Sequence, residues 1–469
     1  MALVMGVDSS TQSTKVELRN AESGALVASG SVPHPSTTPP RSEQDPKLWW
    51  EALLGATARA GAHRPAAISV AAQQHGLVVL GERDLPLRPA KLWNDTESAP
   101  DAGWLRKQLP GGATEWAAAV GSVPVASFTI TKLSWLHRTE PDVFGRIRRV
   151  CLPHDYLTQR LCGEFVTDRG DASGTGYWSP ATGEYRYDLL GIVDRDLDWE
   201  AALPEVLGTG EHRDARDGGA IVAAGTGDNM AAALGLGLRT GQLAISIGTS
   251  GTAFAVSDSP TADASGAVAG FASACGRFLP LACTLNATKV TDAFARLLDL
   301  DVEQLSSLAT HSSSRGLTLV PYLDGERTPD RPDATGTLAG IRGDVTREHI
   351  ARAAFEGVVC GLLDGIDALG RAGVDIGSSI LLVGGGARST AYRQIVADLT
   401  QRAVIVPAAE ELVALGACVQ AAAALHGRDP LEIAEAWGLG RGATIDPAIS
   451  ADQADEVRTR YARVRDGEG

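Results

Sequence analysis

The sequence predicts an α/β protein of two large domains, and three observations support that prediction. Buried strand patterns alternate with helical patterns along the chain, as in layered α/β folds. An apolar strand that enters a hydroxyl-rich turn and returns as a second strand occurs twice, about half a chain apart. Such a repeat indicates a duplicated domain. At 469 residues the chain is also long for a single hydrophobic core.

The first strand–turn–strand unit has a strand at 3–8, a turn from Ser9 to Ser13 and a second strand from Val16. The second unit has a strand at 243–247, a turn at 248–251 and a strand at 253–256. We place the domain boundary at 239–242, which gives domains of 1–240 and 241–469. The other expected strands are 68–72, 149–152, 220–224 and 380–383, and the expected helices are 127–140, 230–238 and 390–400.

Charge and apolar patterning exclude several classes of protein. The formal net charge of −15 argues against binding to a nucleic-acid backbone, which requires clustered Lys and Arg. No stretch reaches the roughly 20 apolar residues that span a bilayer, and the first residues have a strand pattern and not that of a signal peptide. The six cysteines lack metal-site spacing, so we expect free thiols. A cytoplasmic protein without a membrane partner is the prediction.

Both hydroxyl-rich turns carry groups suited to phosphates. Asp8 ends a strand and offers a carboxylate for Mg²⁺, Thr11 offers a hydroxyl, and Lys15 is near enough in sequence to reach a phosphate. In the second turn, Thr249 offers a hydroxyl and Gly251 permits close approach of a ligand to the backbone. A plain hairpin is the competing interpretation of each turn taken alone.

A third turn, Gly384-Gly385-Gly386-Ala387-Arg388-Ser389, joins an expected strand to an expected helix. Three consecutive glycines cost conformational entropy, which indicates that something approaches the backbone closely. The spacing is neither a Rossmann fingerprint nor a Walker loop. Either a nucleotide or tight strand–helix packing explains the glycines.

Asp228 is the candidate general base. It follows Gly227 at the expected start of a helix, where free N–H groups stabilise a carboxylate. A helix N-cap is the competing interpretation, and the two roles are compatible. A base fixed at a helix start is well placed to accept a hydroxyl proton.

Several segments, taken together and in order, resemble the FGGY family of carbohydrate kinases. They run from near residue 4 to near residue 420, so the combination is far more specific than any one of them. The main segments are Asp8-Ser9-Ser10-Thr11, Ser42-Glu43-Gln44-Asp45-Pro46, Gln73-Gln74-His75-Gly76, Leu92-Trp93-Asn94-Asp95, Leu152-Pro153-His154-Asp155, Gly227-Asp228-Asn229, Ser246-Ile247-Gly248-Thr249-Ser250-Gly251, Pro321-Tyr322-Leu323-Asp324-Gly325-Glu326-Arg327-Thr328-Pro329 and the turn from Gly384 to Ser389.

The resemblance implies two actin-like, ribonuclease-H-like domains, each with a mixed sheet flanked by helices, and an active site in the cleft between them. It implies ATP and Mg²⁺ as cofactors, Asp228 as the catalytic base and a sugar as acceptor. Asp8 would hold Mg²⁺ directly or through water. The expected sugar contacts are Gln74, His75, Asn94, Asp228 and Asn229, and the expected ATP contacts are Thr11, Lys15, Thr249, Gly251, Gly385, Gly386 and Ala387.

The loops around Gln74 and Asn94 most resemble those of family members that act on D-xylulose. Ribulose, arabinitol, gluconate and glycerol stay open as acceptors, since some relatives carry Met where this chain has Gln74. Many relatives carry Gly where this chain has Ser10, so the first phosphate turn must have a conformation that a non-Gly residue can adopt. Glu326 and Arg327 fit either an ordinary loop ion pair or a cleft role. The resemblance also implies a homodimer.

Two rival classes make different predictions. An actin-like or chaperone-like ATPase would carry a partner-binding domain or a long lid, and a sugar-sensing regulator would lack the base or carry a helix-turn-helix. The sequence contains neither an extra domain nor a lost base, because Asp228 is present.

Overall fold

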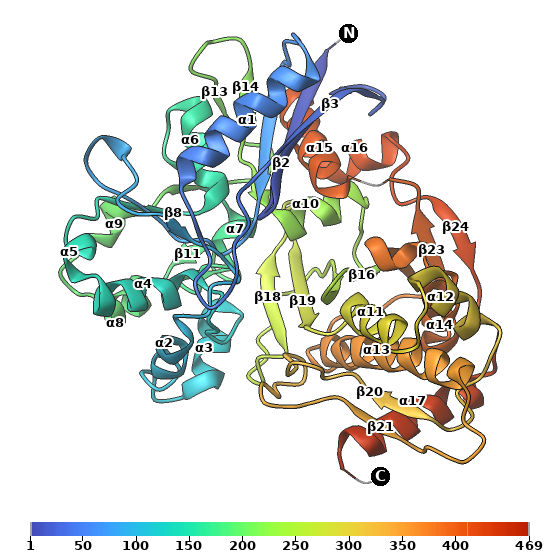
Figure 1. Cartoon of the computed structure of the whole chain (residues 1–469). Coiled ribbons are helices and arrows are strands. Elements are labelled where there is room, and N and C mark those ends of the chain that lie inside the picture. The colour runs from blue at the N-terminus through green and yellow to red at the C-terminus, as the bar shows by residue number, and fades with distance from the viewer. Residues whose placement is uncertain (1, 410, 468–469) are drawn as a thin grey trace.

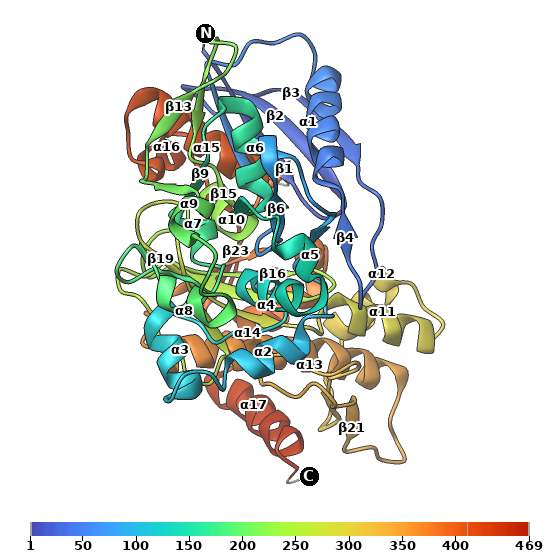
Figure 2. The same ribbon diagram turned by 90° about the vertical axis from the view of Figure 1, so that its left-hand side faces the viewer.

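The computed structural model describes residues 2–409 and 411–467, and it contains two seven-stranded sheets with helices packed on them (Figure 1). Both sheets mix parallel and antiparallel pairs. The predicted α/β fold with mixed sheets is therefore confirmed. Figure 2 shows the same arrangement from the side and places the N-terminus and the C-terminus at opposite ends of the molecule.

The first sheet has the strand order β13-β14-β5-β1-β2-β3, with β15 also paired to β5. Strand β1 pairs antiparallel with β2 and parallel with β5. The bounds are β1 (Leu3–Ser9), β2 (Ser13–Asn20), β3 (Leu26–Pro33), β5 (Ala67–Ala72), β13 (His212–Asp214), β14 (Ile221–Ala223) and β15 (Thr226–Gly227).

The second sheet repeats this plan. Its order is β18-β19-β17-β16-β22-β23-β24, and β16 pairs antiparallel with β17 and parallel with β22. The predicted duplication of the strand–turn–strand unit therefore holds for whole sheets. The bounds are β16 (Leu243–Ile247), β17 (Gly251–Ala255), β18 (Val268–Ala272), β19 (Phe278–Thr284), β22 (Ser379–Val383), β23 (Ala403–Pro407) and β24 (Gly442–Ile445).

The remaining strands form two-stranded pairs, and the helices fill the layers around the sheets. The short strands are β4 (Glu43–Gln44), β6 (Val78–Leu80), β7 (Ala90–Lys91), β8 (Arg149–Cys151), β9 (Val166–Asp168), β10 (Trp178–Ser179), β11 (Glu184–Tyr185), β12 (Glu205–Leu207), β20 (Thr318–Val320) and β21 (Thr337–Ala339). The helices are α1 (Pro46–Ala60), α2 (Ala99–Leu105), α3 (Gly112–Val120), α4 (Thr129–Thr139), α5 (Pro141–Phe144), α6 (Pro153–Cys162), α7 (Arg169–Ala172), α8 (Tyr187–Val193), α9 (Trp199–Ala202), α10 (Asp228–Gly235), α11 (Thr288–Leu297), α12 (Val302–Thr310), α13 (Arg347–Arg371), α14 (Thr390–Thr400), α15 (Leu412–His426), α16 (Pro430–Ala436) and α17 (Ala451–Arg465).

Strand β1 is buried on both faces, because side chains alternate along a strand and each face has its own helix cover. Met5 and Val7 pack in one cluster with residues of α1 and α6. Val4 packs on the opposite face with residues of α15. Figures 1 and 2 show α1 and α15 on either side of these strands. Asp8 continues the face of Val4, which places its carboxylate on the side of α15.

The ends of three parallel strands meet at one edge of the first sheet. In the register of the sheet, Ser9 of β1 and Gly227 of β15 both pair with Ala72 of β5. The segments that follow these strands therefore lie together. They carry the Asp8 turn, the loop of Gln74 and the start of α10, and carboxyl-terminal strand ends are where α/β folds hold their ligands.

Helix α10 lies between the two halves of the molecule. Met230, Ala233 and Leu234 pack with residues of β16, β17, β19 and β22. On its other side α10 packs against α15, which comes from the last part of the chain and covers the first sheet. The division at 239–242 thus separates the strands of the two sheets, while α15 crosses back over that boundary. The assignment of 1–240 and 241–469 to two domains remains a proposal.

The approach of α10 to α15 is very close. A Cβ atom on Gly416 of α15 would lie 1.8 Å from the carbonyl oxygen of Ala231, and one on Gly235 would lie 2.1 Å from that of Leu412. The small Ala and Gly side chains of α10 make this close packing possible. Glycine at both positions is a steric requirement of the crossing.

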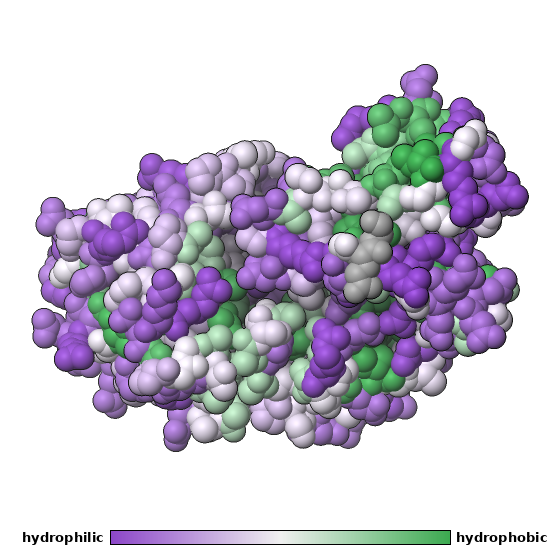
Figure 3. Space-filling view, turned by 90° about the horizontal axis from the view of Figure 1, so that it is seen from below, coloured by the Kyte–Doolittle hydropathy of each residue, from purple (hydrophilic) through white to green (hydrophobic). Residues whose placement is uncertain are grey.

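Three further features concern membrane-spanning helices, the cysteines and the hydropathy of the surface. Among the helices of residues 2–409 and 411–467, none is both long enough and apolar enough to cross a bilayer. All six cysteines are free. Seen from below, hydrophilic residues line much of the rim, and hydrophobic ones gather on the lobe at the upper right (Figure 3).

We predict that Gly416→Ala destabilises the protein by about 1–3 kcal/mol, because the added methyl group forces the two helices apart. Urea unfolding followed by circular dichroism measures this change. Gly103→Ala in α2 is the matched control, since no atom lies within 4 Å of the added Cβ. It should raise stability by roughly 0.5–1 kcal/mol through helix propensity. Equal unfolding midpoints for both variants would contradict the steric requirement.

Candidate active site

A cavity of about 200 Å³ lies between the two halves of the chain. The first half contributes the loop after β5, the start of α10 and the segment before α4, and the second half contributes β17, β18, β19 and one loop. The lining residues used below are Gln74, His75, Trp93, Phe128, Asp228, Asn229, Ser250, Phe271, Cys283 and Arg327. Four of the five predicted sugar contacts therefore share one cavity: Gln74, His75, Asn229 and the predicted base Asp228.

Asp228 is the first residue of α10, and Gly227 occupies the N-cap position without a side-chain cap. The N-cap interpretation of Asp228 is therefore wrong by one residue. One carboxylate oxygen, Oδ1, accepts hydrogen bonds from the backbone N–H and the side-chain amide of Asn229, at 2.8 and 2.9 Å. Burial raises the pKa of Asp228 from 3.8 to about 7, and the charges of Asp8 and Asp171 add to the rise. A carboxyl with this pKa is suited to accept a proton near neutral pH.

Gln74 and Asn229 form a pair beside the base. The Asn229 amide donates to Gln74 Oε1 at 2.7 Å, whereas Gln74 Nε2 is buried without a partner among the described residues. An unpaired buried donor costs free energy unless a ligand accepts from it. Gly227 makes the arrangement possible, because a Cβ there would lie 2.5 Å from Gln74 Cγ.

His75 is held in an uncommon backbone conformation, with φ at 66°. Its carbonyl oxygen accepts from Thr129 Oγ1 at 3.2 Å and from the buried ammonium of Lys132 at 3.1 Å. Nδ1 lies 2.7 Å from the carbonyl oxygen of Gly174, so it carries the ring proton and Nε2 is left as an acceptor. Burial lowers the pKa of His75 to about 3, which keeps the ring neutral.

Two phenylalanines form the apolar wall beside His75. The Phe128 ring centroid lies 5.0 Å from that of His75, and the Phe271 centroid lies 5.5 Å from it. One ring comes from each half of the chain. Neither Phe128 nor Phe271 could be predicted from the sequence as part of the site, because a single Phe in an apolar context gives no chemical signal.

Asn94 is not among the residues that line the cavity, although it was expected to contact the sugar. Its neighbour Trp93 lines the cavity, and the indole N–H donates to Thr11 Oγ1 at 2.9 Å. The loop is fixed by Lys91, whose fully buried ammonium lies 3.0 Å from Asp95 and 2.6 Å from Glu97. This charge cluster positions Trp93 at the cavity mouth.

Asp8 carries the best candidate position for Mg²⁺. Its side chain is buried, and Oδ1 has no hydrogen-bond partner among the described residues. Burial raises the pKa of Asp8 to about 7 against the opposing charge of Lys15. A buried carboxylate oxygen without a partner fits a hard cation, directly or through bound water.

The other residues of the first turn are engaged within the protein. Thr11 Oγ1 donates to Gln73 Oε1 at 3.0 Å, and Lys15 Nζ lies 2.7 Å from Glu411 beside the start of α15. Both side chains would have to exchange these partners to contact a phosphate. The Lys15–Glu411 pair is exposed, so breaking it costs little.

The second turn is fixed by backbone hydrogen bonds. The Thr249 carbonyl accepts from the N–H of Ala287, at the start of α11. Packing requires glycine at position 251, because a Cβ there would lie 2.5 Å from Leu362 Cδ2 and 2.8 Å from Thr284 Oγ1. Ser250, between them, lines the cavity and was not among the expected contacts.

The three glycines of the third turn differ in how much space surrounds the position of an added Cβ atom. A Cβ on Gly384 would lie 2.6 Å from the carbonyl oxygen of Ile247, and one on Gly386 would lie 2.4 Å from Ile247 Cγ2. These two positions support tight strand–strand packing, and Ala387 is buried beside them. Gly385 has no atom within 4 Å of its Cβ position, so a ligand has room to approach there.

A fully buried charge cluster lies behind the base. His154 Nδ1 is 2.7 Å from Asp171, and Nε2 is 3.2 Å from Asp155. Burial alone would lower the pKa of His154, but the surrounding carboxylates raise it to about 10. Asp168 accepts from Thr226 Oγ1 at 2.8 Å, which ties the cluster to the turn that carries Asp228.

We predict that Asp228→Asn raises the melting temperature at pH 8. The folded-state pKa of Asp228, about 7, lies above its ordinary value of 3.8, so the folded protein binds the extra proton between these values. Stability contributed by this group is therefore lost as pH rises through 7. Asn keeps both bonds from Asn229 and carries no charge. The increase in melting temperature should vanish near pH 4. Glu303→Gln, at an exposed position, is the control, and its melting temperature relative to the wild type should show no such pH dependence.

Comparison with known proteins agrees with this geometry. Residues 3–235 match the N-terminal domain, and 243–425 the C-terminal domain, of the FGGY family of carbohydrate kinases. The xylulose kinase of Streptomyces coelicolor is 49% identical over 462 residues, covering 96% of this chain and 94% of that protein. The xylulose kinase of Escherichia coli is 35% identical, with 85% of each chain covered. The crystal structure of xylulose kinase from Bifidobacterium adolescentis is 40% identical, with 99% of each chain covered and a TM-score of 0.90. With both halves matched and the cavity between them, the chain belongs to the FGGY family of carbohydrate kinases.

Proposed function

We propose that this chain transfers the γ-phosphoryl group of ATP to the 5-hydroxyl of D-xylulose and forms D-xylulose 5-phosphate. The observation that carries the proposal is Asp228, a half-buried carboxylate with a pKa of about 7 in a small cavity. The similarity to xylulose kinases over nearly the whole chain selects the acceptor. Fold alone would not, because one fold serves many substrates.

The size of the cavity favours a small acceptor. Its volume of about 200 Å³ is below the range of roughly 300–1,000 Å³ that holds drug-sized ligands. The nucleotide must therefore bind outside it, along the turns of Thr249 and Gly385. Gln74 Nε2 offers a donor and His75 Nε2 an acceptor for sugar hydroxyls. A site with unpaired buried polar groups strongly rejects analogues that lack the matching hydroxyl.

In the proposed reaction, Asp228 accepts the proton of the acceptor hydroxyl as that oxygen attacks the γ-phosphorus of ATP. The bond from γ-phosphorus to the bridging oxygen breaks, and its electron pair leaves with ADP. Asp8 would hold Mg²⁺, which neutralises phosphate charge when it is bound. Asn229 orients the Asp228 carboxylate through its two hydrogen bonds.

Thr11, Lys15, Thr249, Gly251, Gly385, Gly386 and Ala387 belong to the proposal as the ATP-side residues. Gly385 has the strongest structural support, because it alone of its glycine run has open space at its Cβ position. Asn94 stays in the proposal as a sugar contact, since its Oδ1 is buried without a hydrogen-bond partner among the described residues. Assembly into a homodimer and a location in the cytoplasm are also part of the proposal, and they rest on family resemblance alone.

We predict that coupled ADP-release assays with Mg-ATP show strong preference for D-xylulose over D-ribulose, L-ribulose, D-arabinitol, D-gluconate and glycerol. Asp228→Asn should lower kcat by at least about 100-fold, because it removes the base, while sugar binding measured by calorimetry stays close to normal. Preference for another acceptor would change the assigned sugar, while Asp228 would remain the proposed base. Near-normal turnover of Asp228→Asn would contradict the assignment of the base.

We predict that Gly385→Val raises the KM for ATP by about tenfold or more, because its side chain fills the space left for the nucleotide. The KM for the sugar and the melting temperature should change little, since the side chain meets no protein atom near its Cβ. Gly343→Val is the matched control, because Gly343 also has open space but lies outside the three turns. Equal KM values for ATP in both variants would exclude Gly385 from the nucleotide site.

A further inference from the structure

Arg327 reaches the sugar cavity from the second half of the chain, and nothing in the proposed reaction uses it so far. Within residues 2–409 and 411–467, no carboxylate oxygen lies within the 4.0 Å of an ion pair from its guanidinium. Its charge nevertheless acts on both walls of the cavity. It opposes the burial-driven rise in the pKa of Cys283 and adds to the fall in the pKa of His75. A guanidinium without a counter-ion in a substrate cavity is available to an anion.

The neighbouring Glu326 does not neutralise Arg327. The Glu326 carboxylate is buried and accepts from the backbone N–H groups of Leu285 at 2.6 Å and Arg327 at 2.8 Å, and from the side-chain amide of Asn286 at 2.9 Å. The ordinary loop ion pair considered for Glu326 and Arg327 is therefore wrong. Glu326 anchors the main chain at Arg327, and the Arg327 guanidinium is left free to enter the cavity.

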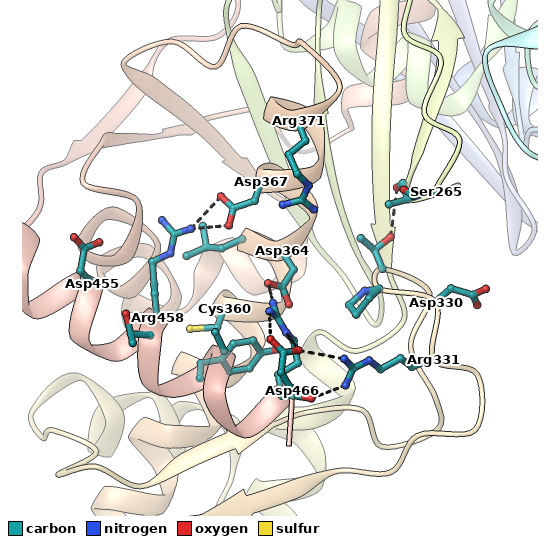
Figure 4. Close-up of a pocket in the computed structure, with 18 residues that line it drawn as sticks. Ser265, Asp330, Arg331, Cys360, Asp364, Asp367, Arg371, Asp455, Arg458 and Asp466 are labelled. Carbon is teal, nitrogen blue, oxygen red and sulfur yellow. Dashed lines mark hydrogen bonds and ion pairs between the residues drawn. The ribbon is translucent and has the colours of Figure 1, made fainter. Parts of the chain in front are cut away.

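The far side of the same loop is anchored as well. The backbone groups of Glu326 and Arg331 exchange two hydrogen bonds of 2.9 Å, which close a loop in which Arg327 is the first residue. Figure 4 shows the Arg331 side chain directed toward Asp466 in a groove of about 700 Å³, where the two residues are 3.2 Å apart and Arg331 also donates to the carbonyl oxygen of Arg465. With both ends fixed, Arg327 is held in place before substrate binds.

We propose that Arg327 is a further catalytic residue, whose guanidinium binds the phosphoryl group as it passes from ATP to the sugar. The inference rests on the proposed kinase function. The cavity receives a neutral sugar and must release a sugar phosphate that carries about two negative charges. The new bond joins the acceptor oxygen to the γ-phosphorus, the bond to the bridging oxygen breaks, the proton goes to Asp228 and ADP leaves. Negative charge therefore enters a cavity that Asp228 lines, and Asp8 lies near enough for its charge to raise the pKa of Asp228.

A guanidinium that meets this charge stabilises the transition state and the product more than the neutral sugar. Interactions that strengthen only in the transition state raise kcat and leave the affinity for the substrate unchanged. An arginine that instead held sugar hydroxyls would stabilise substrate and transition state alike, and its loss would raise KM with kcat unchanged. The two roles are thus separable by kinetics.

The test compares Arg327→Met, Arg327→Lys and Arg331→Met with the wild-type enzyme, using the acceptor that the wild type prefers. Arg327→Met should lower kcat about 100-fold, the size of effect seen when one charge-stabilising donor is lost. The KM for the sugar should stay within about twofold. Arg327→Lys should retain part of the rate, because it keeps the charge but not the planar fork. Arg331→Met removes an arginine from the same loop outside the sugar cavity, and its kcat should stay close to that of the wild type.

Calorimetry supplies a second measurement that does not depend on turnover. Arg327→Met should weaken binding of the sugar 5-phosphate by at least about tenfold, while binding of the unphosphorylated sugar is unchanged. A raised KM with normal kcat, unchanged binding of the sugar phosphate, or an equal loss in Arg331→Met would each overturn the proposal. Inactivity of the wild type with every acceptor would instead refute the proposed function, so the two failures are distinguishable.

Discussion

The close crossing of α10 and α15 is the constraint on which the rest of the structure depends. Gly235 and Gly416 leave no room for a side chain where the helices meet. Helix α15 covers β1 and β5 of the first sheet, and α10 packs on the second sheet through Met230 and Leu234. The pair therefore joins the two halves, and because Asp228 begins α10, the same contact fixes the candidate base relative to both sheets.

The buried carboxyl groups near that crossing lower the stability of the folded protein. Asp8, Asp171 and Asp228 are all carboxyls whose burial raises their pKa values to about 7. Concentrating such groups in a region of low dielectric costs folding free energy, as is common at functional sites. His154 offsets part of the charge behind the base, whereas the cavity itself contains no described cation except Arg327. The site is thus arranged to bind a cation and a phosphoryl group that compensate its charge.

Much of the fold could be predicted from the sequence because its signals are local. A strand of alternating or continuous apolar residues, a hydroxyl-rich turn and a glycine run are visible in short windows, and helix 390–400 and strand 243–247 were predicted with the bounds that the structure shows. Motif resemblance extended these local signals to the base, the Gln74–His75 loop and the third turn. A loop motif does not say which of two neighbouring side chains lines a cavity. Here Trp93 lines it and Asn94 does not, so the sugar contact of Asn94 stays a prediction.

The sequence by itself determined the family, the repeated sheet plan and the candidate base, since each rests on residues close together in the chain. Only the tertiary structure decided that α15 returns to the first sheet and that Phe128 and Phe271 form one wall with His75. It also decided that Arg327 lines the same cavity as Asp228, with no carboxylate of the described residues paired to it. It also separated Gly384 and Gly386, which packing requires, from Gly385, which has open space. The physical reason is that burial, steric clearance and charge pairing depend on residues far apart in sequence, and these meet only once the chain has folded.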